Sequence, residues 1–217
     1  MKLLTTNNTK IMKGRGRGHM VFGMHMSPGR TCNQASKGCL ASCLNTAGHG
    51  VYRLTQESRA RKTAFFWNDL HGFLAQLRVE ISKAIKHAEK KGLKPAFRLN
   101  LTSDIPWEAY GIPQEFPDTQ FYDYSKYHDR HPPANYHLTF SRSESLLNHD
   151  KAKAWLRRGG NVAVVFKKEL PKTFWGQPVH SGDEDDLRFL DPKGIIGLTA
   201  KGRAKKDTTG FVIEVET

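Results

Sequence analysis

The chain has 217 residues, of which 38% are hydrophobic, and this favours one folded domain with a buried core over a disordered chain. Its 34 Lys and Arg against 21 Asp and Glu give a net charge of +13, which favours anionic partners such as DNA or RNA. No apolar run reaches the roughly 18 residues of a membrane helix, and the first eight residues lack the apolar centre of a secretion signal. We therefore expect a cytoplasmic protein without membrane contact.

Residues 1–19 are polar and end in a stretch, 13–18, in which glycine alternates with basic residues. Such a stretch is typical either of a flexible arm or of a loop whose backbone N–H groups and guanidinium groups wrap a phosphate. We expect residues 1–19 to be a flexible basic arm and residues 20–217 to form a single α/β domain.

The segment 20–26 is apolar and predicts a buried strand, and a glycine-rich loop at 29–50 follows it. This loop holds every cysteine of the chain, namely Cys32, Cys39 and Cys43. Three cysteines in one loop make a poor disulfide framework and indicate a reducing compartment. The loop therefore favours a metal or cluster site over a structural crosslink.

Two kinds of metal site fit these residues. Three thiolates are suited to an iron–sulfur cluster, and they leave one iron without a protein ligand, free to take a small molecule. Alternatively, His49 completes a structural zinc site with three Cys and one His, although the loop lacks the paired CxxC of most such sites. A third possibility is that the three thiols are buried and have no special role.

Apolar segments and helices alternate along the rest of the chain. Helices are predicted at 55–66, at 70–88 with Asn68 or Asp69 as N-cap, and at 150–158. Strands are predicted at 96–101, 120–124, 136–140, 161–166, 195–198 and 211–213. This alternation indicates a largely parallel sheet, although the link from 126 to 136 is short for a parallel connection and shows no helix.

Polar residues follow several predicted strands directly, where ligands bind in parallel α/β proteins. We expect Asn100, Ser103 and Ser141 to line a cofactor or substrate pocket there. Asp104, Asp123 and Lys126 are candidate catalytic groups, the two carboxylates as general acid or base. The alternative is that the two aspartates only pair with Arg98 and Lys126.

An acidic segment at 181–191 stands out in this basic chain. Its carboxylates suit a divalent cation, or they accept hydrogen bonds from a ribose or an ammonium group. The alternative is an exposed loop paired with neighbouring Lys and Arg. We include Asp183 and Arg188 among the expected cofactor-binding residues.

The cysteine loop after a first strand resembles that of the radical S-adenosylmethionine enzymes, which carry a CxxxCxxC motif, whereas six and three residues separate the cysteines here. The chain also resembles the phage gene product 88 family from about residue 23 onward. The segments that carry this second resemblance are 32–48, 98–107, 121–126, 135–141 and 182–189. Together the two resemblances imply a phage protein with a full or partial (β/α) barrel, a [4Fe-4S] cluster and S-adenosylmethionine as the ligand at the open iron.

Two functions are consistent with these observations. The first is a radical-SAM-like enzyme that binds S-adenosylmethionine at a cluster on the three cysteines and cleaves it reductively. The second is a non-enzymatic, cluster-bearing protein that binds DNA or RNA through its positive charge.

Overall fold

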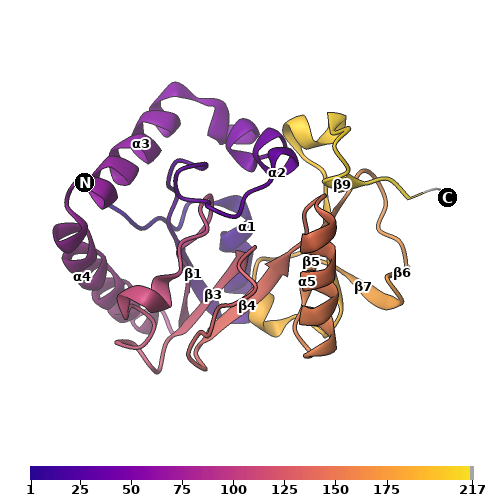
Figure 1. Ribbon diagram of the computed structural model, residues 1–217. Helices are drawn as coiled ribbons and strands as arrows, with labels where there is room; N and C mark the ends of the chain where they lie inside the picture. The colour runs from indigo at the N-terminus through magenta and orange to yellow at the C-terminus, as the bar shows by residue number, and fades with distance from the viewer. Residues whose placement is uncertain (216–217) are drawn as a thin grey trace.

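The structure is a computed structural model that describes residues 1–215, so residues 216 and 217 of the expected domain lie outside it. One sheet dominates it, and its strands run in the order β1-β2-β3-β4-β5-β8-β7-β6, with β9 beside β5 (Figure 1). The strands are β1 (His19–Gly23), β2 (Lys94–Arg98), β3 (Gln120–Ser125), β4 (Tyr136–Ser141), β5 (Val162–Phe166), β6 (Thr173–Phe174), β7 (Gln177–Ser181), β8 (Ile195–Thr199) and β9 (Val212–Ile213). The α-helices are α1 (Thr9–Met12), α2 (Lys37–Ala41), α3 (Arg53–Asn68), α4 (Leu70–Glu89) and α5 (Leu146–Arg157). Short 3₁₀ helices are η1 (Lys13–Arg17), η2 (Leu44–Thr46), η3 (Gly48–Val51), η4 (Trp107–Tyr110), η5 (Arg188–Leu190) and η6 (Gly202–Lys206).

The sheet is parallel at every strand pair except β6–β7, which confirms the expected largely parallel sheet. Even β3 and β4 pair in parallel, although residues 126–135 join them without a helix. The sheet is open, because β1 and β6 stand at its two ends and do not pair with each other. A full barrel, one of the two expected forms, is therefore not formed, and the three long helices α3, α4 and α5 are too few for the outer ring of helices that a closed barrel needs.

The first 19 residues, which we expected to be a flexible arm, are folded onto the domain. Leu3 and Ile11 are buried, and Thr5 forms an antiparallel bridge with Gly23 at the end of β1. The side chain of Glu80 on α4 accepts hydrogen bonds from the backbone N–H groups of Leu3 and Leu4. This segment thereby brings α1 to the edge of the sheet next to β1.

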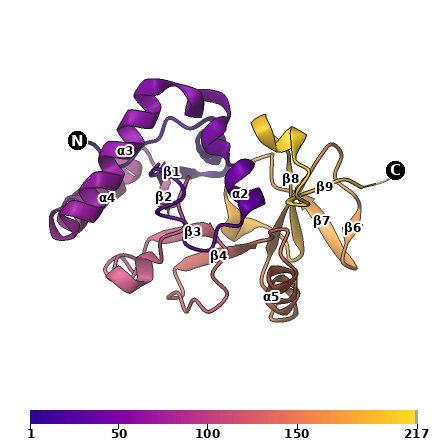
Figure 2. The ribbon, with the colours of Figure 1, turned by 45° about the horizontal axis from the view of Figure 1, so that its top comes forward.

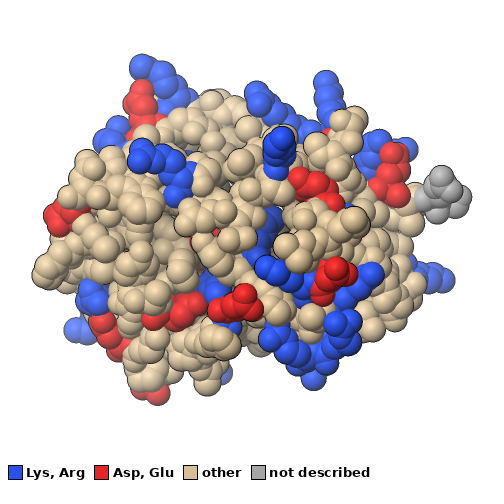
Figure 3. Space-filling model, viewed as in Figure 1, with Lys and Arg blue, Asp and Glu red and all other residues tan. Residues whose placement is uncertain are grey.

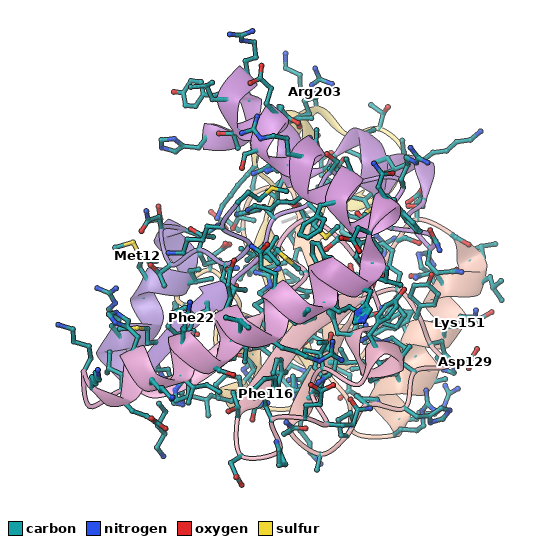
Figure 4. The ribbon with its side chains drawn as sticks, turned by 90° about the vertical axis from the view of Figure 1, so that its left-hand side faces the viewer. Met12, Phe22, Phe116, Asp129, Lys151 and Arg203 are labelled. Carbon is teal, nitrogen blue, oxygen red and sulfur yellow. The ribbon has the colours of Figure 1, made fainter. Side chains whose placement is uncertain are left out.

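The helices α3 and α4 cover one face of the β1–β3 part of the sheet (Figure 4). The predicted periodicity of α4 is confirmed, because Leu77 and Ile81 are fully buried. Phe22, Phe97 and Phe121 occupy paired positions on β1, β2 and β3, and their ring centroids lie 5.3 Å apart at each step. These stacked rings fix the register of the three strands whose ends form the pocket described below.

The helix α5 and the β6–β7 hairpin lie at the other end of the sheet (Figure 1). The other predicted strands are present within a few residues of their expected bounds, but β6 and β7 were not predicted. The reason is their composition: the two strands are short and partly exposed, and Pro178 and His180 interrupt any apolar alternation. Strands at the end of a sheet need fewer buried residues than central strands.

Candidate functional site

A pocket of about 250 Å³ lies at the carboxyl ends of the parallel strands, which is where parallel α/β proteins bind ligands. The cysteine loop and α2 run past the same ends of the strands, between the two halves of the sheet (Figure 2). The polar and sulfur-bearing residues that line the pocket are Lys10, Cys32, Cys39, Ser42, Cys43, Arg98, Asn100, Thr102, Ser103, Asp104, Tyr124, Ser125, Lys126, Ser141, Asp183, Thr199 and Lys201. All three cysteines therefore reach one pocket, as the sequence predicted for a common site.

The cysteine loop is held in place by residues that follow β4 and precede β9, in the middle of the sheet. Ser36 caps α2 by accepting a hydrogen bond from the backbone N–H of Cys39. The carboxylate of Glu144, just after β4, accepts hydrogen bonds from the Ser36 hydroxyl at 2.6 Å and from the Gly38 N–H at 2.8 Å. A Cβ on Gly38 would lie only 2.3 Å from the Thr209 hydroxyl oxygen, so only glycine fits against this neighbour. These contacts fix the segment between Cys32 and Cys43.

The three cysteines are free thiols. Burial raises the pKa of Cys32 and of Cys43, so both favour the neutral thiol until a cation or metal ion lies close to the sulfur. In residues 1–215 no group of three or more His, Cys, Asp and Glu side chains is arranged to hold a single metal ion. His49, the fourth ligand of the zinc interpretation, does not line the pocket, and its ring packs against Tyr52 instead.

Lys126, Ser141, Ser103 and Asp104 lie together at the pocket, as expected from their positions after the strands. The Lys126 ammonium donates to the Ser141 hydroxyl at 2.7 Å, and its backbone N–H donates to Asp104 Oδ2 at 2.8 Å. The other oxygen of that carboxylate is buried, has no hydrogen-bond donor and lies 3.6 Å from the guanidinium of Arg130. Burial raises the pKa of Asp104.

Asp123 lies outside the pocket lining, in the interior behind it. Its carboxylate accepts hydrogen bonds from the backbone and side-chain amides of Asn100, at 2.9 and 3.1 Å, and from the Tyr136 hydroxyl at 2.7 Å. Burial raises the pKa of this carboxyl to about 7. In this arrangement Asp123 holds Asn100 in position and does not reach the pocket.

Asn100 lines the pocket, but its side chain is already occupied by contacts within the protein. Its amide oxygen accepts hydrogen bonds from the Ser103 hydroxyl, the Ile105 N–H and the Trp107 indole. Its amide nitrogen donates to Ile105 as well as to Asp123. The Asp123–Asn100 pair therefore shapes the 100–107 loop, which carries Ser103 and Asp104.

The acidic segment 181–191 forms ion pairs with basic residues, several of them buried. Asp186 is fully buried and accepts hydrogen bonds from the Arg98 guanidinium to both its oxygens, each at 2.9 Å. Arg188 is buried as well, lies outside the pocket lining and pairs with Asp191 at 2.9 Å. Of this segment only Asp183 lines the pocket, where it pairs with Lys201 at 2.9 Å.

Sequence reasoning missed Lys10 and Tyr124 as pocket residues. Lys10 lies on α1, in the segment expected to be flexible, and burial lowers its pKa to about 8. Its ammonium is 3.8 Å from Asp186. The hydroxyl of Tyr124 is buried and has no hydrogen-bond partner within residues 1–215. On β3, the side chain of Tyr124 points to the opposite face of the sheet from its neighbour Asp123. A wider use of strand alternation would have suggested Tyr124, whereas no sequence pattern pointed to Lys10.

We group the charged pocket residues into two sets. The ion-pair set comprises Lys10, Arg98, Asp183 and Lys201, with Asp186 behind them. The cysteine set comprises Cys32, Cys39, Cys43, Asp104 and Lys126. The four cations of the lining outnumber its two carboxylates, so the pocket favours a ligand that carries negative charge.

Fold and site together define an open-sheet α/β protein with a ligand pocket and three free cysteines at the carboxyl ends of its parallel strands. The chain matches the family described as Gene product 88 over residues 2–215 and belongs to that family, which confirms the family resemblance. No curated protein and no solved structure matches the chain, so the expected likeness to radical S-adenosylmethionine enzymes gains no support from these comparisons. In the described part of the chain, no helix is long and apolar enough to cross a membrane.

Proposed function

We propose that this protein is an iron–sulfur protein in which Cys32, Cys39 and Cys43 hold a [4Fe-4S] cluster, and that the pocket beside them binds S-adenosylmethionine. One observation carries the proposal: all three cysteines of the chain are free and line one pocket at the carboxyl ends of the parallel strands. Three thiolates would leave one iron of such a cluster without a protein ligand, and that iron could take a small molecule.

The arrangement of the thiols suits a cluster better than a single ion. A zinc ion gathers its four ligands around one point, and residues 1–215 contain no such group. In a cubane cluster each thiolate binds a different iron, so the sulfurs stand farther apart while still facing one space. Three cysteines that line one pocket support a cluster, whereas His49, which the zinc site needs, lies outside that lining.

Positive charge next to the cysteines also supports the proposal. The backbone N–H of Asn45 points to the Cys43 sulfur at 3.5 Å, and the Asn45 side chain accepts a hydrogen bond from Arg59 on α3. Arg59 is only 6% exposed and has no carboxylate within 4 Å in residues 1–215. A buried, unbalanced cation is costly in an empty protein and becomes favourable beside thiolate ligands.

The remaining pocket residues suit the carboxylate of a small ligand such as S-adenosylmethionine. Lys126 offers an ammonium group that has no carboxylate partner within residues 1–215, which fits a ligand carboxylate. Asp104 lines the same pocket, but both oxygens of its carboxylate are taken up within the protein, one by the Lys126 N–H and the other beside the Arg130 guanidinium. When bound, a cluster with an open iron would supply a coordination position and one-electron chemistry, and Lys126 would orient the ligand beside it.

The cluster is tested by anaerobic reconstitution with iron and sulfide, followed by metal analysis and absorption spectroscopy. We expect iron and sulfide in near-equal amounts and broad absorption near ~400 nm. Cys32→Ala, Cys39→Ala and Cys43→Ala should each lose most of the iron. Gln34→Ala changes an exposed residue of the same loop and should retain it. Stoichiometric zinc without iron, or equal iron in all four variants, would overturn the proposal.

The ligand is tested separately on the reconstituted protein. Calorimetry should show binding of S-adenosylmethionine, and Lys126→Met should weaken it at least tenfold without changing the iron content. Reduction in the presence of this ligand should release 5′-deoxyadenosine or another cleavage product. Normal iron with no binding and no product would rule out S-adenosylmethionine while leaving the cluster in place.

A further inference from the structure

A second hollow lies between α5 and the β6–β7 hairpin. It has a volume of about 370 Å³ and is lined by Lys153, Leu156, Arg157, Trp175 and Gln177. We call it the α5 groove. None of its residues lines the cysteine pocket.

The cations around the α5 groove have no acidic partners. Lys153 and Arg157 are exposed, and neither forms an ion pair in residues 1–215, which is also true of Arg158 at the end of α5. Lys and Arg side chains gather over α5 (Figure 3), and the part of this helix that carries Lys151 lies at the outer edge of the molecule (Figure 4). The only acidic residue of α5 is Asp150. The groove therefore attracts a polyanion.

Trp175 is the aromatic wall of the groove, and it stands in an unfavourable backbone conformation. Its φ is 52°, and within the described residues no other residue apart from glycine has a positive φ. With Gly176, whose φ is 72°, it forms the two-residue turn between β6 and β7. Turns of this kind strongly prefer Asn or Asp at the position of Trp175. The ring packs against Phe174, with centroids 4.8 Å apart, and its remaining surface borders the groove, so the strained turn presents an aromatic side chain to a ligand there.

The surroundings of the ring suit stacking beside charge. Lys153 lies 5.4 Å from the centre of the Trp175 ring, and His149 meets the ring edge-on. A groove that combines an aromatic wall, an amide side chain at Gln177 and unpaired cations matches a nucleotide: a base to stack and phosphates to pair. Double-stranded DNA hides its bases inside the helix, so the match is to single strands.

The geometry points to the α5 groove as a binding site for single-stranded nucleic acid, with Trp175 stacking on a base and Lys153 and Arg157 contacting the flanking phosphates. This inference is independent of the cluster, because it depends on no residue of the cysteine pocket. It also assigns part of the net charge of +13 to a defined binding surface.

The test measures binding of the full-length chain to a fluorescein-labelled oligodeoxythymidylate of about 12 nucleotides by fluorescence anisotropy over a range of salt concentrations. We expect tighter binding to this strand than to a duplex of equal length. The double variant K153E/R157E should weaken binding at least tenfold and lower the salt slope by about 0.7 for each phosphate that is no longer neutralised. The matched control K86E/K90E makes the same change in net charge at exposed positions near the C-terminal end of α4 and should have a much smaller effect.

Trp175→Asn separates stacking from folding. Asparagine suits the turn but loses the packing of the ring against Phe174, so the variant should remain folded in the absence of urea, yet bind the strand about tenfold more weakly. Trp175→Phe should keep most of the affinity. The inference is overturned if no strand binds at low salt, if duplex binds more tightly, if the two charge variants lose affinity equally, or if Trp175→Asn binds as the wild type does.

Discussion

The two sets of charged residues in the cysteine pocket differ in how their charge is balanced. In the ion-pair set each cation contacts a carboxylate: Arg98 lies 2.9 Å and Lys10 3.8 Å from Asp186, and Lys201 lies 2.9 Å from Asp183. In the cysteine set Lys126 has no carboxylate within 4 Å in the described chain, and its ammonium contacts only a serine hydroxyl and the Phe211 ring. The charges of the ion-pair set balance one another without a ligand, whereas the Lys126 ammonium of the cysteine set can still pair with an anion.

This difference predicts where stability and function reside. Residues of the ion-pair set hold β2, β3 and the 181–191 segment together, so changing them should lower the free energy of unfolding strongly. Residues of the cysteine set should affect ligand or metal content more than stability. The predictions below test this division, from the largest expected effect on stability to the smallest.

Asp186→Asn should have the largest effect. The substitution leaves the buried Arg98 guanidinium without its counter-charge, and breaking a buried pair in this way costs roughly 3–5 kcal/mol. Urea unfolding of the variant and the wild type measures the loss. Glu115→Gln is the control, because it breaks the exposed pair with Arg78 and should cost less than about 1 kcal/mol. Equal losses in the two variants would show that Asp186 is not the centre of a buried network.

His25 predicts a pH dependence. Burial, together with the nearby cations Arg59, Lys62 and Arg98, lowers its pKa from 6.5 to about 3. Between these two values the unfolded chain binds a proton that the folded protein does not, so the free energy of unfolding falls as the pH is lowered. The fall contributed by His25 is at most about 1.4 kcal/mol per pH unit, and it ends above pH 6.5.

Comparing wild type with His25→Gln isolates this contribution from other titrating groups. Urea unfolding between about pH 7 and pH 4 should show a shallower loss of stability in the variant. His71→Gln, at an exposed position near the start of α4, should keep the wild-type slope. Parallel curves for the wild type and His25→Gln would mean that folding does not lower the pKa of His25.

Much of the pocket was predictable because strand position alone determines it. Ser103, Asp104, Lys126 and Ser141 follow apolar segments that the sequence displays clearly, and parallel pairing brings them to one edge. Asp123 was predicted as a catalytic group only because it lies close in sequence to the end of β3. Its side chain points to the opposite side of β3 from Tyr124, so it reaches Tyr136 and not the pocket.

Most contacts of the ion-pair set could not be predicted from the sequence. Lys10 and Asp186 are 176 positions apart, and no periodic pattern connects them. The acidic segment stood out, but composition cannot distinguish an exposed acidic loop from a carboxylate buried against Arg98. That distinction depends on which strands become neighbours, and the unpredicted strand β7 leads directly into this segment.

Gly38→Ala tests how the cysteine loop is held. A methyl group there meets the Thr209 hydroxyl at 2.3 Å and Phe211 Cβ at 2.8 Å, so the loop or its neighbours must move. We expect a loss of about 1–3 kcal/mol in urea unfolding. Gly16→Ala is the control, because nothing lies within 4 Å of the added methyl group. If both variants are equally stable, the loop adapts freely and its cysteines are not held in fixed positions.

Lys126→Met should have the smallest effect on stability and so tests the comparison most directly. Methionine keeps most of the apolar length beside Phe211 and removes a cation that has no carboxylate partner, so the free energy of unfolding should change by less than about 1 kcal/mol. Arg98→Met, which leaves Asp186 without its main partner, should cost several times more. If Lys126→Met is as damaging as Arg98→Met, then Lys126 belongs to the structural framework, and the unbalanced charge that assigns a ligand to the cysteine set does not exist. If it is neutral, the protein keeps a partly buried ammonium for which folding provides no reason, and a bound anion is the reason that remains.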